Sequence, residues 1–374
     1  MKDRRLRAEW EKQSAILMAF PHKNSDWARY IDKARVCFIH IIEHILCFES
    51  VILCVDLQDE EGIEILCKHF APFQSNTQSA LQEYVEGYLN TDIAQQSLIK
   101  PYLHTFNTQS PYTLHIMRVR TNDTWARDFG ALGVESAGEN KLVKCIFNGW
   151  GLKYPSHYDN AISESIFAKK HIIKADIVLE GGSIESNGAG VLLTNTQCLL
   201  EKNRNPHLSQ NEIESKLREY FGLDSVLWLH YGYLAGDDTD SHIDTLARFI
   251  SEDTIAYITC DDKQDEHFES LKSMEAELQA LKQPNGEPYK LVALPFTKKA
   301  IYDDSGDRLP ASYANFLFVN GGLLVPTYGD KNDKKALEIL SKALPKHRVV
   351  GVDCHSLILW HGSLHCVSMQ VYDS

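Results

Sequence analysis

Residues 315–352, NFLFVNGGLLVPTYGDKNDKKALEILSKALPKHRVVGV, contain in one short stretch the pattern that decides the fold. The strand-like runs 315–319 and 323–326 are joined by Asn320-Gly321, which is typical of a tight hairpin because both residues tolerate positive φ. A helical apolar period follows over 333–344, and another strand-like run covers 348–352. The stretch therefore predicts two strands of a hairpin, then a helix, then a further strand.

The same succession recurs along the chain. Helices are predicted at 31–49, 209–221 and 263–282, and each precedes a strand-like run, at 51–55, 226–230 and 289–294. Further strands are predicted at 114–119, 144–147, 191–194, 254–259 and 364–371. Ser209 and Glu212 have the spacing of a capping box at the start of one helix. Because no Pro- or Ser-rich linker interrupts the pattern, we expect one α/β domain over residues 1–374, made of several similar units.

Composition excludes several classes of protein. The chain has 374 residues, of which 44% are hydrophobic, and a formal net charge of -13, so a nucleic-acid-binding surface is not expected. Its nine cysteines are scattered without a Cys-x-x-Cys pair, as in reduced proteins of the cytoplasm. The apolar run 15–20 is too short for a signal peptide or a membrane span. The prediction is a cytoplasmic protein that binds neither nucleic acid nor membrane, with homo-oligomerisation left open.

Two separated motifs offer a nucleophile and a general acid and base. Cys366 follows the small-residue stretch 361–365, and His242 stands two residues before Asp244. A thiol and an imidazole make a catalytic pair if the fold brings them together, and His242 and Asp244 would share a face of an extended strand. A buried structural cysteine is the alternative for Cys366, as it is for Cys354, which also has a histidine neighbour.

Carboxylates in turns flanked by Gly or Trp favour a cationic substrate. They are Asp128, Glu180, Asp238 and Asp244. Trp125 lies three residues before Asp128, so the pair could stack on and bind a planar cation such as a guanidinium. A surface turn at Glu180 and a core tryptophan beside a structural Arg127–Asp128 pair remain the alternatives.

No metal or organic cofactor is expected. Asp238, Asp240 and His242 imitate the first ligands of a calcium loop, but Ile243 and Phe249 replace its glycine and its closing glutamate. No His/Cys pair has zinc spacing, which leaves at most a two-ligand zinc site open. Residues 188–193 begin a dinucleotide-binding pattern without its third glycine, and there is no phosphate-binding lysine motif.

Five motifs together resemble the agmatine deiminases, a group of guanidine-modifying enzymes related to bacterial peptidylarginine deiminases. The matching stretches are Trp125 to Asp128, Phe147 to Gly151, Leu179 to Ser183 with Asn203 to Pro206, Gly236 to Arg248, and Ser312 to Asp330 with His365-Cys366. The chain departs from the family at Trp360 and His361, where glycines are more usual, and at Asp238, where another acidic residue is often found.

The resemblance implies a five-fold pseudo-symmetric α/β-propeller of ββαβ modules, the pentein fold. It also implies a metal-free, cofactor-free hydrolase that converts agmatine to N-carbamoylputrescine and ammonia. The expected catalytic residues are Cys366 as nucleophile, His242 as acid and base, and Asp128, Glu180 and Asp244 around the guanidinium, with Trp125 and Asp238 completing the pocket. An imidazolium beside Cys366 is expected to lower the pKa of its thiol. The alternatives are a deiminase of free or peptidyl arginine and a non-catalytic guanidine-binding propeller.

Overall fold

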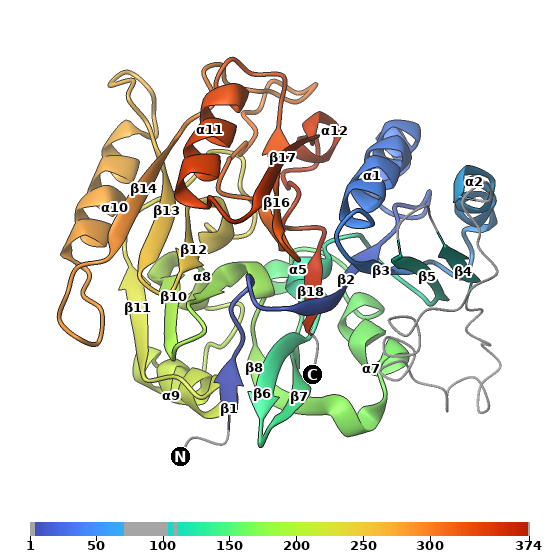
Figure 1. The fold of residues 1–374 in the computed structure, drawn as a ribbon, viewed down its shortest axis with the longest axis horizontal. Helices are drawn as coiled ribbons and strands as arrows, with labels where there is room; N and C mark the ends of the chain where they lie inside the picture. The colour runs from blue at the N-terminus through green and yellow to red at the C-terminus, as the bar shows by residue number, and fades with distance from the viewer. Residues whose placement is uncertain (1–3, 71–103, 108–110, 373–374) are drawn as a thin grey trace.

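A computed structural model describes residues 4–70, 104–107 and 111–372, and its described strands form five sheets (Figure 1). Three sheets repeat one order of an antiparallel pair, a helix and a strand parallel to the second. Their elements are β9 (Ile184–Ser186), β10 (Val191–Asn195), α9 (Gln210–Phe221) and β11 (Ser225–Leu229); β12 (Ala247–Ser251), β13 (Thr254–Thr259), α10 (Phe268–Ala280) and β14 (Lys290–Pro295); and β15 (Leu317–Val319), β16 (Gly322–Thr327), α11 (Asp333–Ala343) and β17 (Arg348–Asp353). The ββαβ order predicted from residues 315–352 is therefore confirmed.

The other two sheets are variants of the same unit. In one, β6 (Leu132–Ser136) and β7 (Glu139–Ile146) are antiparallel, β8 (Ile172–Val178) is parallel to β7, and β1 (Arg4–Leu6) extends the β6 edge; α6 (Gly149–Leu152) and α7 (Ile162–Ile166) connect β7 to β8. In the other, β18 (Met369–Tyr372) pairs antiparallel with β2 (Gln13–Ala19), and α1 (Ile31–Ile45) leads to the parallel strand β3 (Ser50–Val55). After β3 and α2 (Glu60–Phe70), this sheet is extended by β5 (Thr113–Arg118) and β4 (His104–Asn107). No sheet closes on itself in the described part of the chain.

Local sequence accounts for many boundaries. Ser209 and Glu212 exchange the capping-box hydrogen bonds at the start of α9, and Gly222 ends that helix with φ of 65°. Asn320-Gly321 joins β15 to β16 as predicted, with Val319 paired to Gly322. Every residue of β2 is buried, which explains the apolar run at 15–20 as a central strand of a sheet.

One prediction about local conformation is wrong, and one condition is not met. Within the run 364–371 only residues 369–371 form a strand, as part of β18, because a turn at 364–368 closes with the Ser368 amide donating to the His365 carbonyl. His242 and Asp244 are not on an extended strand: His242 precedes the 3-10 turn η6 (Ile243–Thr245), which contains Asp244. No described helix has both the length and the apolar character needed to cross a membrane.

The chain passes from one sheet to another six times among the described residues, and five of these connections, all except the one from β1 to β2, carry the candidate site residues. Trp125 and Asp128 lie between β5 and β6, and Glu180 lies between β8 and β9. The other three connections carry Asp238, His242 and Asp244 after β11, Asn315 after β14, and His365 and Cys366 after β17. Each sheet therefore delivers at least one polar side chain to the same region.

Candidate active site

A cavity of about 120 Å³ is lined by residues of three of these connections, between β5 and β6, β11 and β12, and β17 and β18, and by the segments that follow β2 and β7. Its described lining residues are mainly acids and aromatics: Asp26, Trp27, Asp123, Trp125, Asp128, Trp150, Tyr154, Asp237, Asp238, Thr239, His242, Asp244, Thr245, Trp360, His361, Gly362 and Cys366. None of these residues is Lys or Arg. A buried cavity with this lining favours a cation over an anion.

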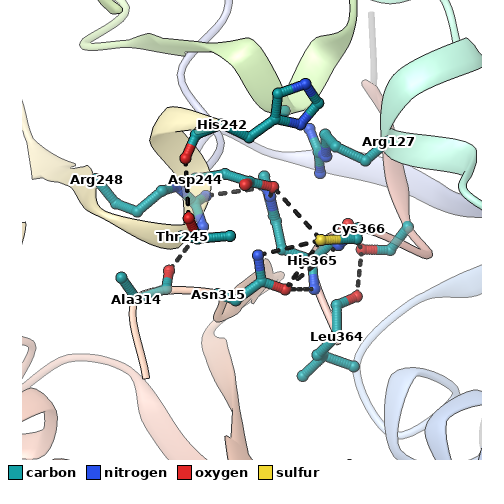
Figure 2. Close-up of polar contacts among 12 residues, drawn as sticks. Arg127, His242, Asp244, Thr245, Arg248, Ala314, Asn315, Leu364, His365 and Cys366 are labelled. Atoms are coloured by element: carbon teal, nitrogen blue, oxygen red, sulfur yellow. Dashed lines mark hydrogen bonds and ion pairs between the residues drawn. The ribbon is translucent and has the colours of Figure 1, made fainter. Parts of the chain in front are cut away.

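Cys366 reaches the cavity from the turn between α12 (His355–Ile358) and β18. Its Sγ lies 3.3 Å from Asn315 Nδ2 and 3.9 Å from Asp244 Oδ2, as the dashed lines of Figure 2 mark. The Asn315 Oδ1 atom accepts from the backbone amides of His365 and Cys366 at 2.9 and 3.4 Å. Asn315 thus holds the turn that presents the sulfur, whereas Cys354 does not line the cavity.

The pKa of the Cys366 thiol differs in direction from the sequence-based expectation. Burial raises this pKa well above its usual value, and the carboxylates of Asp244 and Asp128 raise it further. Burial also lowers the pKa of His242 well below its usual value, so the imidazole is neutral. In the empty cavity the thiol is therefore protonated, and no imidazolium stabilises a thiolate.

His242 faces two carboxylates. Its Nδ1 lies 3.5 Å from Asp128 Oδ1, and its Nε2 lies 4.0 Å from Glu180 Oε2. Nε2 is buried and has no hydrogen-bond partner among the described residues. A neutral imidazole with one unpaired nitrogen has the capacity to take up and release a proton.

Asp128 is held on α5 (Ala126–Phe129) with both oxygens occupied. Its Oδ2 accepts from Trp150 Nε1 at 2.9 Å, and its Oδ1 accepts from the Gly182 amide at 3.0 Å. A Cβ at Gly182 would come within 2.8 Å of Asp128 Oδ1, so a glycine is needed for this approach. Burial is the largest cause that raises the pKa of Asp128 to about 7.

Glu180 is placed differently from the sequence-based expectation. It is fully buried, does not line the cavity, and accepts from Arg204 Nε at 3.0 and 2.8 Å through its two oxygens. Arg204 also donates to Asp240 Oδ2 at 2.7 Å. Glu180 therefore lies beside His242 and is anchored by Arg204, instead of forming the cavity wall.

Trp125 and Asp238 both line the cavity. The Trp125 indole donates to Asp123 Oδ2 at 3.1 Å, and its ring covers Gly362 so closely that a Cβ there would lie 2.0 Å from the ring. Asp238 accepts from the Tyr154 hydroxyl at 2.8 Å. These contacts fix one aromatic wall and one acidic edge of the cavity.

The departures from the family pattern at Trp360 and His361 also face the cavity. Trp360 packs edge-on against Trp27 and Tyr30, with ring centroids 6.3 and 5.9 Å apart. His361 adopts φ of 64°, a conformation that favours glycine, and its Nδ1 lies 2.6 Å from the Gly236 carbonyl. Both residues narrow the cavity where glycines would leave it wider.

One group of potential metal ligands borders the site. Ligand atoms of Glu180, Cys198 and His242 lie within 4.8 Å of one another. The Nε–H group of Arg204 donates to both carboxylate oxygens of Glu180, which are therefore already occupied. The positive charge of Arg204 would also repel a metal ion. The group of Glu180, Cys198 and His242 therefore does not fit a metal.

Sequence reasoning missed several residues of the site. Asn315, Trp150 and His365 stood inside quoted motifs without an assigned role, and Asp123 lies outside those motifs. Glu9 had no local indication at all, because its contact with His365 spans 356 residues. Arg127 is structural, as one alternative held, but its partners are Glu9 and Gln370 instead of Asp128.

Comparison with known proteins places this geometry in a family. The model of the Porphyromonas-type peptidyl-arginine deiminases matches residues 5–371. The chain belongs to this family.

Similar proteins confirm the resemblance to agmatine deiminases. A candidate agmatine deiminase of Marinomonas sp. (strain MWYL1) is 30% identical, with 98% of this chain and 94% of that protein covered. A crystal structure of a candidate peptidyl-arginine deiminase is 47% identical with a TM-score of 0.86, and each chain is covered completely. A Cys-to-Ser variant of the C. jejuni agmatine deiminase with substrate bound is 35% identical with a TM-score of 0.82, covering 99% of this chain and 96% of that one.

Proposed function

We propose that this protein is an agmatine deiminase, which hydrolyses agmatine to N-carbamoylputrescine and ammonia. The observation that carries the proposal is the juxtaposition of the Cys366 thiol with two cavity-lining carboxylates, Asp128 and Asp244, in a cavity whose described lining has no Lys or Arg side chain. Family membership and the agmatine deiminases among its relatives support the same substrate.

The substrate guanidinium would lie between the carboxylates. Asp244 Oδ1 is buried without a hydrogen-bond partner among the described residues, so it is available to a guanidinium N–H. Asp128 offers a second carboxylate, and Trp125 offers an aromatic face. Two charge-assisted contacts would hold the cation planar, with its carbon next to Cys366 Sγ.

Binding of this cation would activate the thiol. Burial and the acidic neighbours keep the pKa of the Cys366 thiol high, and the positive charge of the guanidinium opposes both effects and favours the thiolate. His242 would take the thiol proton as the sulfur attacks the guanidinium carbon. His242 then gives this proton to the departing nitrogen, which leaves as ammonia, and a thiouronium remains on Cys366.

The second half of the reaction uses the same residues. After ammonia departs, His242 would take a proton from a water molecule that attacks the thiouronium carbon. The carbon–sulfur bond then breaks, which regenerates Cys366 and releases the ureido product. Glu180, anchored by Arg204, would keep His242 oriented during both proton transfers. No metal or cofactor takes part in these steps.

Selectivity for agmatine over arginine would follow from charge. An α-carboxylate would need a cationic partner in the cavity, and the described lining offers Asp26, Asp123 and Asp238 instead. We expect kcat/KM for agmatine to exceed that for free arginine by at least about 10²-fold, the scale of a charged group left unpaired in a closed site.

Assay of the ureido product with agmatine, arginine and an arginine-containing peptide tests the proposal. The family model and the 47% identical structure make a peptide the relevant competitor. Efficient citrullination of the peptide would replace agmatine deiminase by the peptidyl alternative. Binding of agmatine without turnover would support the non-catalytic alternative.

We also infer that the five units are arranged as a pseudo-symmetric α/β-propeller. The ββαβ order that the sheets share supports this arrangement.

A further inference from the structure

A buried network lies directly behind the candidate nucleophile, and two of its members, His365 and Glu9, have no role in the chemistry derived above. His365 precedes Cys366, is fully buried and does not line the cavity. Its Nδ1 lies 2.8 Å from Asp244 Oδ2, and its Nε2 lies 2.7 Å from Glu9 Oε1. The imidazole thus bridges a cavity carboxylate to a carboxylate from the segment before β2.

The bridge requires a proton at each end. Each ring nitrogen of His365 lies within 2.8 Å of a carboxylate oxygen. A nitrogen lone pair and an oxygen lone pair would repel each other at this distance, so each contact contains one hydrogen. We place the first proton on Nε2, pointing to Glu9 Oε1, which lies 3.0 Å from Arg127 Nη1. Arg248 Nη2 lies 3.0 Å from the same Nε2 and donates to Glu9 Oε2 at 2.5 Å. The second proton lies between Nδ1 and Asp244 Oδ2, and either atom has the capacity to hold it.

The charges around the network balance for both positions of this proton. The groups that face His365 are Glu9, Asp244, Arg127 and Arg248, and Arg248 is also paired with Glu185. Asp128 and the Cys366 thiol face Asp244 from the cavity side. The two arginines balance Glu9 and Glu185, so a neutral Asp244–His365 pair and a carboxylate–imidazolium pair give the same net charge.

We propose that Asp244, His365 and Glu9 form an internal proton relay, in which Asp244 passes its proton to His365 Nδ1 when a cationic substrate binds at Asp244 Oδ1. Before binding, Asp244 is a carboxylic acid whose Oδ2–H donates to Nδ1. After binding, Asp244 is a carboxylate, His365 is an imidazolium, and Glu9 stabilises the imidazolium through Nε2–H. One O–H bond breaks, one N–H bond forms, and no heavy atom has to move.

The empty site favours the protonated acid for a physical reason. Burial and the neighbouring Asp128 raise the pKa of Asp244 well above its usual value, and burial with Arg127 and Arg248 lowers the pKa of His365. A bound cation reverses the balance, because it stabilises the Asp244 carboxylate. His365 is therefore a positioning residue: it sets the charge of Asp244 without touching the substrate.

The relay rests on the proposed function, because it needs a guanidinium-type ligand beside Asp244. The test measures how many protons are released to the solvent when agmatine binds. Agmatine is titrated calorimetrically into the Cys366→Ala variant, which stops turnover, in buffers that differ in ionisation enthalpy. The titration is done at pH 8.5, where Asp128 is already ionised because its pKa is about 7. With the relay intact, we expect about zero protons released per agmatine bound.

Glu9→Gln in the same background keeps the side-chain shape and removes the charge that stabilises the imidazolium. We expect close to one proton released per agmatine at pH 8.5, and, with Cys366 intact, a fall in kcat/KM of at least about tenfold at pH 7 that lessens as the pH rises. Glu11→Gln is the matched control: Glu11 lies on the same segment but binds Arg5 and Arg7, so the proton count and the pH profile should not change.

Each outcome supports or overturns the relay, the proposed function or both. Equal proton counts with and without the Glu9 charge would overturn the relay, whether both are zero or both are one. A loss of kcat/KM in Glu9→Gln that is the same at every pH, with a lowered unfolding temperature, would assign Glu9 a purely structural role and also overturn it. Absence of any binding heat with agmatine would instead refute the proposed function, and the relay with it.

Discussion

Replacing Asp128 by Asn tests how the cavity holds its cation. The substitution keeps the size of the side chain and removes one charge. Two unit charges about 4 Å apart interact by about 4 kcal/mol at an effective dielectric constant near 20. An amide would also turn an NH2 toward either Trp150 Nε1 or the Gly182 amide, which leaves a buried donor unpaired at a cost of about 1–3 kcal/mol. The cost of the unpaired donor lowers the stability of the fold as well as transition-state binding, so the lost charge interaction decides the effect on catalysis. We expect kcat/KM to fall about 10²- to 10³-fold.

The pH dependence gives this prediction a second measurement. The pKa of Asp128 is about 7, so the wild-type carboxylate is ionised at pH 8.5 and protonated at pH 5.5. The ratio of wild-type to Asp128→Asn kcat/KM, measured by ammonia release, should therefore be largest at pH 8.5 and shrink as the pH falls. Asp159→Asn is the control, since Asp159 is buried and accepts backbone amides but does not line the cavity. A ratio that is constant with pH, or close to one, would refute the reasoning.

Three further predictions concern single residues. A haloacetamidine should label Cys366 and not Cys354, and Cys366→Ala should abolish turnover, as measured by peptide mass spectrometry and ammonia release; labelling at Cys354 with activity intact in Cys366→Ala would sink the assignment. Gly362→Ala should displace Trp125, whose ring would lie 2.0 Å from the new Cβ, and lower kcat/KM at least about tenfold; unchanged kinetics would show that the ring does not serve binding. Burial raises the pKa of Asp123 to about 7, above its unfolded value. Its contribution to stability is therefore full below pH 4 and lost as the pH rises through 7, so urea unfolding should show a decline over this range that Asp123→Asn diminishes; an unaltered decline would contradict the shift.

Local chemistry explains which parts of the fold were predictable. The Asn320-Gly321 hairpin and the α9 cap depend on residues a few positions apart, and both were confirmed. The run 364–371 has the composition of a strand, but contacts with Asn315, about fifty residues away, favour a turn up to Ser368. Sequence pattern cannot weigh such contacts, because they exist only after the sheets have assembled.

The same distinction applies to the site. Cys366, His242, Asp128 and Asp244 were chosen from residue types and motifs, and all four line one cavity. Their catalytic roles stay predictions. The state of the thiol could not be predicted, since burial and neighbouring carboxylates reverse the shift that an imidazolium would cause. The neighbourhood of Glu180 was equally hidden, because Arg204 reaches it from 24 residues away.

The pairing of β18 with β2 has a consequence for the order of events in folding. Cys366 lies just before β18, whose partner strand is near the other end of the described chain, and Ser14 Oγ donates to the Val371 carbonyl across 357 residues. Closing a loop of that length has a large entropic cost, so such contacts form late. During refolding from denaturant, far-UV circular dichroism should therefore recover first and catalytic turnover last. A partly folded chain would carry four nearly complete sheets and yet lack its nucleophile in position.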